Sequence, residues 1–202
     1  MIRIEAGRNM RYKIITGFLV FALVILLGFN LYYYSVMVNK QATMNNMLGQ
    51  IIVAWARQMN YAEYYLENVT TNIDVDGVRY LFWSASDIAE SAWISDGTLY
   101  LEMAITAHFV YNELGPYSEG SPISVKRINP TAIEMIKNLA QRIRDTTALI
   151  LDGNIDIELR NKEGVNPIQL LKEKGVLDEI VNRLVDIRNL AEQISDFNPK
   201  FQ

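Results

Sequence analysis

The chain has 202 residues, of which 50% are hydrophobic and 21% are charged. This composition excludes a disordered chain and a protein with many membrane spans, and the length allows one ordinary domain beside a single membrane segment. Cysteine is absent, which excludes disulfides, thiolate metal sites and cysteine nucleophiles. His108 is the only histidine, so a histidine-based zinc site or a Ser-His-Asp triad is hard to build.

Charge is distributed unevenly along the chain. Four basic residues and one acidic residue precede a long apolar run, and the remainder is acidic enough to give the whole chain a net charge of -4. An acidic domain lacks the electropositive surface that nucleic acid binding requires. We therefore expect no nucleic-acid partner.

The apolar run covers residues 14–38 and contains no charged residue. A helix of about 20 such residues crosses the hydrocarbon core of a bilayer, so the run predicts a single transmembrane helix. Tyr32, Tyr33 and Tyr34 near its far end suit the headgroup layer. Because basic residues are concentrated before the run, the positive-inside bias places the N-terminus in the cytoplasm.

The predicted organisation is a cytoplasmic basic tail over residues 1–13, a transmembrane signal-anchor helix over residues 14–38, and an extracytoplasmic domain over residues 39–202. The expected location is the cell membrane, with the lipid bilayer as a partner. A cleaved signal peptide is the main alternative, but its apolar core is usually about 7 to 15 residues long and is followed by small residues. The exit from the run, Val36 to Lys40, offers no such cleavage site.

Beyond the membrane segment, apolar residues keep helical spacing. Steps of three and four predict one narrow stripe on a helix that continues from the span and stops at residues 74–77. The stripe consists of Met44, Leu48, Ile51, Trp55, Met59, Ala62, Leu66, Val69 and Ile73.

Further helices are indicated by apolar spacing, by proline in the first turn and by glycine at the ends. They cover residues 78–114 (with a break or kink at Asp96 and Gly97), 130–151, 167–175 and 176–195. Between residues 154 and 166, apolar and charged residues alternate, which predicts an extended segment. The predicted fold is all-α: a single N-terminal transmembrane helix continuing into an extracytoplasmic antiparallel helical bundle of about four helices.

An acidic loop after the third of these predicted domain helices is a weak calcium candidate. Calcium takes several oxygen ligands on a tight turn, and a glutamate stands at the distance of the bidentate EF-hand ligand. Ile157, however, occupies the position that requires glycine, and helix termination explains the same residues without a metal. The candidate ligands are Asp152, Asn154, Asp156 and Glu163. No cofactor is expected.

Aromatic residues gather around the first helix connection of the domain. They suggest a small-ligand pocket between helices, although packing at a bundle end would use the same residue types. The candidate pocket residues are Tyr61, Tyr65, Trp83 and Trp93. A glycosylation sequon, Asn68-Val69-Thr70, lies in the predicted first helix.

No catalytic residue pair or motif emerges from the sequence. We therefore expect a membrane-anchored helical interaction protein, a subunit or scaffold of a membrane or envelope complex, with a protein partner or self-association. The alternative is an extracytoplasmic ligand-binding sensory module that acts through a partner protein. We do not expect an enzyme, which is the least favoured of the three hypotheses because no catalytic motif is present, although carboxylates and tyrosines alone can support catalysis.

Overall fold

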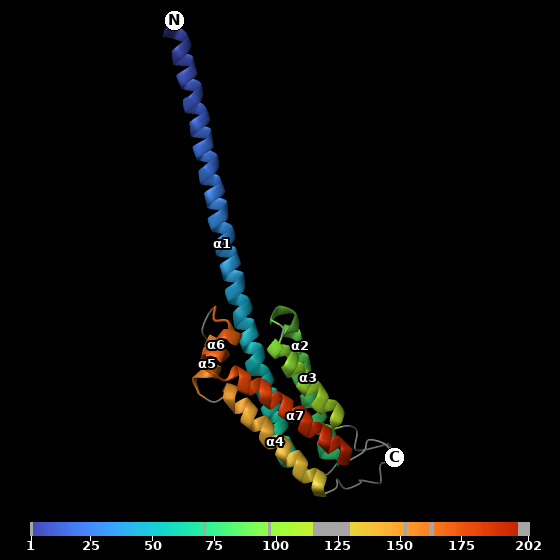
Figure 1. Ribbon diagram of the computed structural model, residues 1–202. Helices are drawn as coiled ribbons and strands as arrows, with labels where there is room; N and C mark the ends of the chain where they lie inside the picture. The colour runs from blue at the N-terminus through green and yellow to red at the C-terminus, as the bar shows by residue number, and fades with distance from the viewer. Residues whose placement is uncertain are drawn as a thin grey trace. The chain divides into compact units, whose positions relative to one another are not determined.

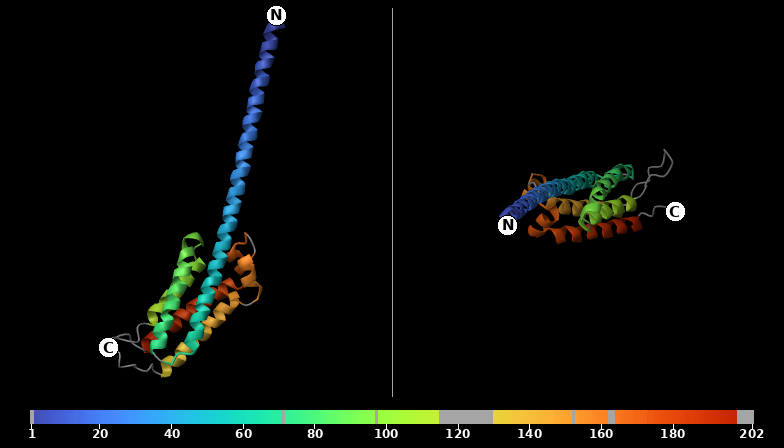
Figure 2. Two further views of the ribbon diagram at one scale, coloured as in Figure 1. Left: turned by 180° about the vertical axis from the view of Figure 1, so that it is seen from behind. Right: turned by 90° about the horizontal axis from the view of Figure 1, so that it is seen from above.

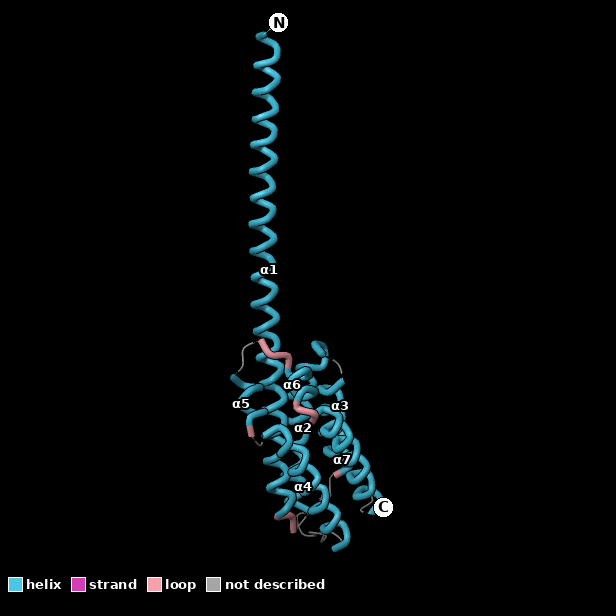
Figure 3. The backbone as a smooth tube through the Cα atoms, turned by 60° about the vertical axis from the view of Figure 1, so that its left-hand side comes forward, coloured by secondary structure: helices cyan, strands magenta, loops and turns pink. Residues whose placement is uncertain are grey.

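The computed structural model describes residues 2–70, 72–96, 98–114, 130–151, 153–161 and 164–197. These residues form seven helices and no strand, so the all-α prediction is confirmed for the part of the chain described (Figures 1 and 3). The helices are α1 (Ile2–Glu67), α2 (Asn72–Asp96), α3 (Thr98–Glu113), α4 (Pro130–Leu151), α5 (Asn154–Asn161), α6 (Pro167–Glu173) and α7 (Leu177–Phe197). The chain divides into two compact units, Met1–Thr43 and Met44–Gln202.

The first unit consists of the N-terminal part of α1. Among residues 15–43, nearly all large apolar side chains are exposed, with Phe18 72% and Leu31 70% accessible. Among the described helices, α1 alone is long and apolar enough to cross a membrane. An apolar helix surface of this length requires an apolar surrounding, which fits a membrane anchor near the N-terminus.

The second unit is organised around one hydrophobic core, to which the rest of α1 and the helices after it contribute. Helix α2 packs against α3, and both α3 and α4 pack against α7, while the short helices α5 and α6 adjoin α4 and α7 (Figure 2). The largest fully buried side chains include Trp55, Phe82, Tyr100 and Ile143. These four come from α1, α2, α3 and α4, so the unit depends on residues far apart in sequence.

The first helix ends earlier than predicted. Helix α1 stops at Glu67, and α2 begins at Asn72, so residues 74–77 lie inside a helix rather than ending one. Val75 and Val78 are buried in the core. Their burial outweighs the weak helix propensity of aspartate and glycine in this segment.

The prediction of an extended segment between residues 154 and 166 is also wrong, because residues 154–161 form α5. Asp156 and Arg160 form an ion pair at 2.6 Å, and a spacing of four residues brings them together on one helix face. Leu159 is buried, whereas Ile157 is 52% exposed. The alternating pattern therefore does not correspond to one buried face.

Other predicted boundaries are confirmed. Helix α2 ends at Asp96 and α3 begins at Thr98, where the sequence predicted a break. Pro130 opens α4, and Asn166 caps α6 by accepting hydrogen bonds from the backbone N–H groups of the second and third residues after it. After α6, Gly175 has φ +71°, a conformation that favours glycine at a helix end.

Candidate interaction surface

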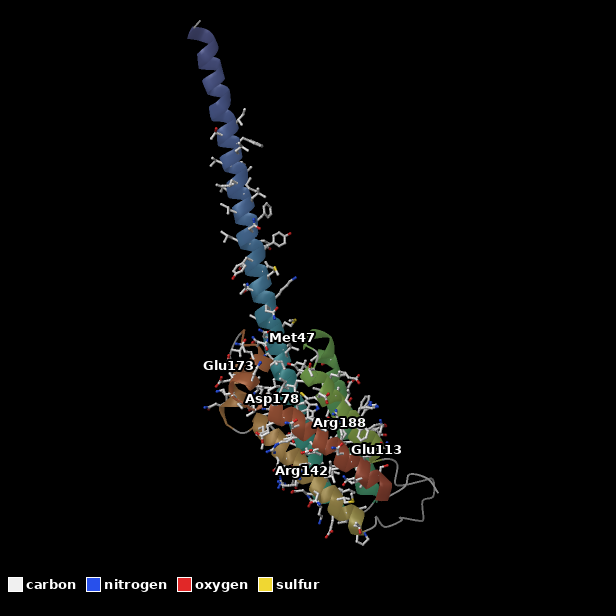
Figure 4. All side chains as sticks on the ribbon, in the orientation of Figure 1. Met47, Glu113, Arg142, Glu173, Asp178 and Arg188 are labelled. Carbon is white, nitrogen blue, oxygen red and sulfur yellow. The ribbon has the colours of Figure 1, made fainter. Side chains whose placement is uncertain are left out.

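Within the second unit, α1 carries a second line of side chains in addition to those in the core. We call it the outer row: Met44, Met47, Ile51, Ala54, Gln58, Tyr61 and Tyr65. Six of these seven residues are apolar or aromatic, and all are exposed or half-buried. Met47 is 59% exposed, Tyr61 61% and Tyr65 54%, so these residues face away from the core, whereas half-buried Ile51 also packs against its edge (Figure 4 labels Met47).

The orientation of this face is fixed by contacts on the other sides of α1. The Tyr100 hydroxyl donates a buried hydrogen bond to the carbonyl of Leu48 at 3.2 Å. On another side, the side chains of Asn45 and Asn46 bond the carbonyl and the N–H of Gly164 at 3.0 and 3.1 Å. These polar contacts hold α1 against α3 and against the segment between α5 and α6, which leaves the outer row uncovered.

The outer row has almost no charge near it. No charged residue occurs between Gln41 and Ala56. Arg57, which flanks the row, lies 3.7 Å from the carboxylate of Asp156. The face is therefore apolar and nearly neutral, which is unusual for a solvated helix surface.

The polar groups beside the core include a buried carboxylate. Glu63 on α1 is 3% exposed and contacts Arg144 of α4 at 2.5 Å, and Arg144 also pairs with Glu67. Burial raises the pKa of the Glu63 carboxyl above its ordinary value, and the attraction of Arg144 opposes that rise only partly. The hydrogen bond with Glu67 is the largest cause that raises the pKa of Arg144, and the charge of Glu63 adds a smaller contribution in the same direction. The geometry is that of a salt bridge that joins α1 to α4.

A second salt bridge connects α3 and α7. Arg188 donates to Glu102 at 2.6 Å and approaches the Thr106 hydroxyl at 3.4 Å. Both charged partners are at least three-quarters buried as side chains. This pair supports packing between the two helices.

The aromatic residues proposed from sequence as a pocket are divided between two surfaces. Tyr61 and Tyr65 belong to the outer row, and the Tyr65 ring packs edge-on against Tyr64 at 5.6 Å. Trp83 stands on α2 and is 51% exposed. The side chain of Trp93 lies outside the described residues. Because Tyr61, Tyr65 and Trp83 are more than half exposed, their aromatic area is available for contact.

Hollows occur elsewhere in the described part of the second unit, and Tyr61, Tyr65 and Trp83 line neither of the two described here. A hollow of about 240 Å³ between α2 and α3 includes Glu90, Ile105, His108 and Phe109 in its lining. A hollow of about 550 Å³ is lined by Thr98, Leu99, Ile168, Leu177, Asp178, Val181 and Asn182, from the start of α3, α6 and α7. The sequence offered no signal that singled out these residues as a site.

The calcium candidate is described only in part, since Asp152 and Glu163 lie outside the described residues. Asn154 is exposed at the start of α5. The Asp156 carboxylate accepts hydrogen bonds from Arg160 at 2.7 and 2.6 Å. Among the described residues, no group of three or more metal-ligating side chains is gathered.

The sequon lies after the first helix rather than within it. Asn68 is exposed just beyond the end of α1, and its side-chain amide donates to the carbonyl of Tyr64 at 2.8 Å. The asparagine is therefore on an accessible turn.

No protein-family model, curated protein or solved structure matches the chain. The fold and the surface define the class on their own: a helical protein with one candidate membrane-spanning helix near its N-terminus.

Proposed function

We propose that this protein is a membrane-anchored helical interaction protein, a subunit or scaffold of a membrane or envelope complex. The observation that carries the proposal is the exposed outer row of α1, from Met44 to Tyr65. Aromatic residues and methionine are enriched in protein interfaces, and charged residues are depleted at interface centres. The outer row has this composition.

A comparison within the same unit supports the interpretation. The exposed residues of α7 between its first turn and residue 193 are Asp178, Glu179, Asn182, Val185, Asp186, Asn189, Glu192 and Gln193. One of these eight is apolar, whereas six of the nine exposed residues of α1 between Met44 and Tyr65 are apolar or aromatic. A helix face that contacts only water is typically polar, as on α7, so the outer row suits contact with a partner.

The proposal includes a topology. Residues 1–13 form a cytoplasmic basic tail, residues 14–38 span the cell membrane as an uncleaved anchor, and residues 39–202 form an extracytoplasmic antiparallel helical bundle. The basic residues before the apolar run and the exposed apolar side chains of the first unit support this arrangement. The variant Lys137→Cys tests this topology, because Lys137 is exposed on α4 and the chain has no cysteine of its own. A membrane-impermeant maleimide should label it in intact cells, and labelling only after lysis would overturn the orientation.

The interaction itself is tested by a photoreactive amino acid at Ala54 in the full chain, expressed in its own host. We expect protein adducts on irradiation, because Ala54 lies in the outer row. The matched control carries the same group at Asp186, which is exposed on the polar face of α7. Equal yields at both sites, or no protein adduct at Ala54, would refute the proposal.

The second candidate function is an extracytoplasmic ligand-binding sensory module that acts through a partner protein. The hollow of about 550 Å³ among α3, α6 and α7 favours it, because small-molecule sites usually measure about 300–1,000 Å³. Its lining combines apolar side chains with the Asp178 carboxylate and the Asn182 amide. A small metabolite that binds there should raise the thermal midpoint of the wild-type protein and not of Val181→Trp, in which the hollow is filled. An enzymatic function has no comparable support among the described residues.

A further inference from the structure

We propose that the outer row of α1 pairs with the outer row of a second copy of this chain, as a parallel and in-register helix pair. The inference rests on the proposed function, namely that the outer row is an interface, and it names the partner. The row runs from Met44 to Tyr65 within the second unit.

The spacing of the row is the first argument for a helical partner. Its members follow one another at steps of three, four, three, four, three and four residues. This alternation is the a/d pattern of a coiled coil, which keeps the contact line facing one partner helix over its full length. At 1.5 Å per residue the row is about 30 Å long. A partner must therefore present a straight helix of similar length and period, and the row itself is such a helix.

The charge distribution is the second argument. A symmetric parallel pair places each residue opposite its own copy, so any charge in the contact line would meet a like charge. The row contains no charged residue, and Arg57 beside it is paired with Asp156. With Met44 at an a position, the contact position before it is Lys40, at which a parallel pair would bring two like charges together. The proposed pairing therefore begins at Met44.

The one polar residue of the row supports a defined register. Gln58 occupies an a position when Met44 is assigned to a, and it is half-buried. A lone polar residue at an a position favours the alignment in which it meets its own copy and can hydrogen bond with it. Two copies anchored through the same end of α1 would also share direction and be concentrated in one plane, which favours parallel pairing.

Single-cysteine variants of the full chain test the pairing, because the chain contains no cysteine. Met47→Cys, Ala54→Cys and Tyr61→Cys place the thiol at d positions of the outer row. Asn60→Cys is the matched control: it is exposed on the same helix but occupies a c position, away from the contact line. Asp186→Cys on α7 reports random collision in the membrane. Oxidation in native membranes should give a disulfide-linked dimer for the row variants in at least about tenfold greater yield than for the two controls.

The possible outcomes separate this inference from the proposed function. No dimer with the row variants, or equal dimer yields with Asn60→Cys, overturns the pairing. If the photoreactive group at Ala54 then captures a different protein, the interaction function stands and only the identity of the partner is wrong. If it captures no protein, both fail.

Substitution by a charge gives an independent readout. Ala54→Glu would bring two carboxylates together in the pair, so cross-linking through Tyr61→Cys in the same chain should be lost. Asn60→Glu should leave that cross-linking unchanged. Both variants alter exposed positions, so the unfolding midpoint of each should match the wild type, which distinguishes loss of pairing from loss of fold.

Discussion

Gly49 lies where α1 passes closest to α5 within the second unit. A Cβ atom at this position would stand 2.5 Å from the carbonyl oxygen of Leu159 and 3.3 Å from its carbonyl carbon. These are backbone atoms, so they cannot move aside as a flexible side chain would. Gly49→Ala therefore has to separate the two helices, and the separation strains the neighbouring hydrogen bonds from Asn45 and Asn46 to Gly164.

The expected effect is a loss of stability despite the better helix propensity of alanine. Overpacking costs about 1–3 kcal/mol, and replacing glycine by alanine inside a helix returns about 1 kcal/mol. Because the Cβ would stand 2.5 Å from a backbone oxygen, the overpacking cost should lie in the upper part of that range, at about 2–3 kcal/mol. We therefore expect Gly49→Ala to lower the free energy of unfolding by about 1–2 kcal/mol. Gly77→Ala is the matched control, because Gly77 is also inside a helix and a Cβ there meets no atom within 4 Å. It should raise the free energy of unfolding by about 0.5–1 kcal/mol.

The assay is denaturant unfolding of the full-length protein in mild detergent, followed by tryptophan fluorescence. All three tryptophans, Trp55, Trp83 and Trp93, belong to the second unit, so the signal reports on that unit alone. If Gly49→Ala is at least as stable as the wild type, the close approach of α1 and α5 is refuted. A similar gain in both alanine variants would mean that only helix propensity matters at these two glycines.

Two further substitutions probe the polar contacts of the core. Burial raises the pKa of Glu63, so its stabilising contribution is fully present below its unfolded pKa and is lost as pH rises through the folded value. Glu63→Gln should therefore gain stability relative to wild type as pH rises above the ordinary range of a glutamate carboxyl. Urea unfolding as a function of pH measures this difference, and a constant difference would contradict the role of burial. Tyr100→Phe removes the buried hydrogen bond to the carbonyl of Leu48 and should lower the free energy of unfolding by about 1 kcal/mol, measured in the same assay. A change below the error of the measurement would mean that this bond is not formed.

The long apolar N-terminal helix and the main helices of the second unit were predictable because their signals are local. Twenty or more apolar residues without charge, as in residues 14–38, need no tertiary information to be recognised. The proline at the start of α4 and the Asn166 cap of α6 act within one turn of the helix. Signals of this kind can therefore be recognised from the sequence alone.

The errors occurred where tertiary packing decides. In α5, alternation suggested an extended segment, but a short helix forms there and buries Leu159 in the core. At the start of α2, residues 74–77 resemble a helix stop until the burial of Val75 is known. Neither burial nor pairing with a distant element is visible in a short sequence window.

The candidate surface was missed for a related reason. The sequence interpretation placed Met44 and Ile51 with Leu48 and Trp55 in one stripe, whereas the structure buries Leu48 and Trp55 and leaves Met44 exposed. In the run from Ile51 to Ala56 every residue is apolar, so period alone cannot separate two rows on one helix. Contacts from α3 and the segment after α5 were needed to show which row is covered.

Two adjacent residues of α1 should separate folding from association. Leu66 is fully buried and Tyr65, its neighbour in the outer row, is 54% exposed. Leu66→Ala should lower the free energy of unfolding by about 2–5 kcal/mol, because it removes core contacts and leaves a cavity. Tyr65→Ala should change it by less than about 0.5 kcal/mol while reducing cross-linking through Ala54→Cys. If Tyr65→Ala instead destabilised the unit as much as Leu66→Ala does, the outer row would be part of the core, and the stability of the second unit alone would explain its apolar character.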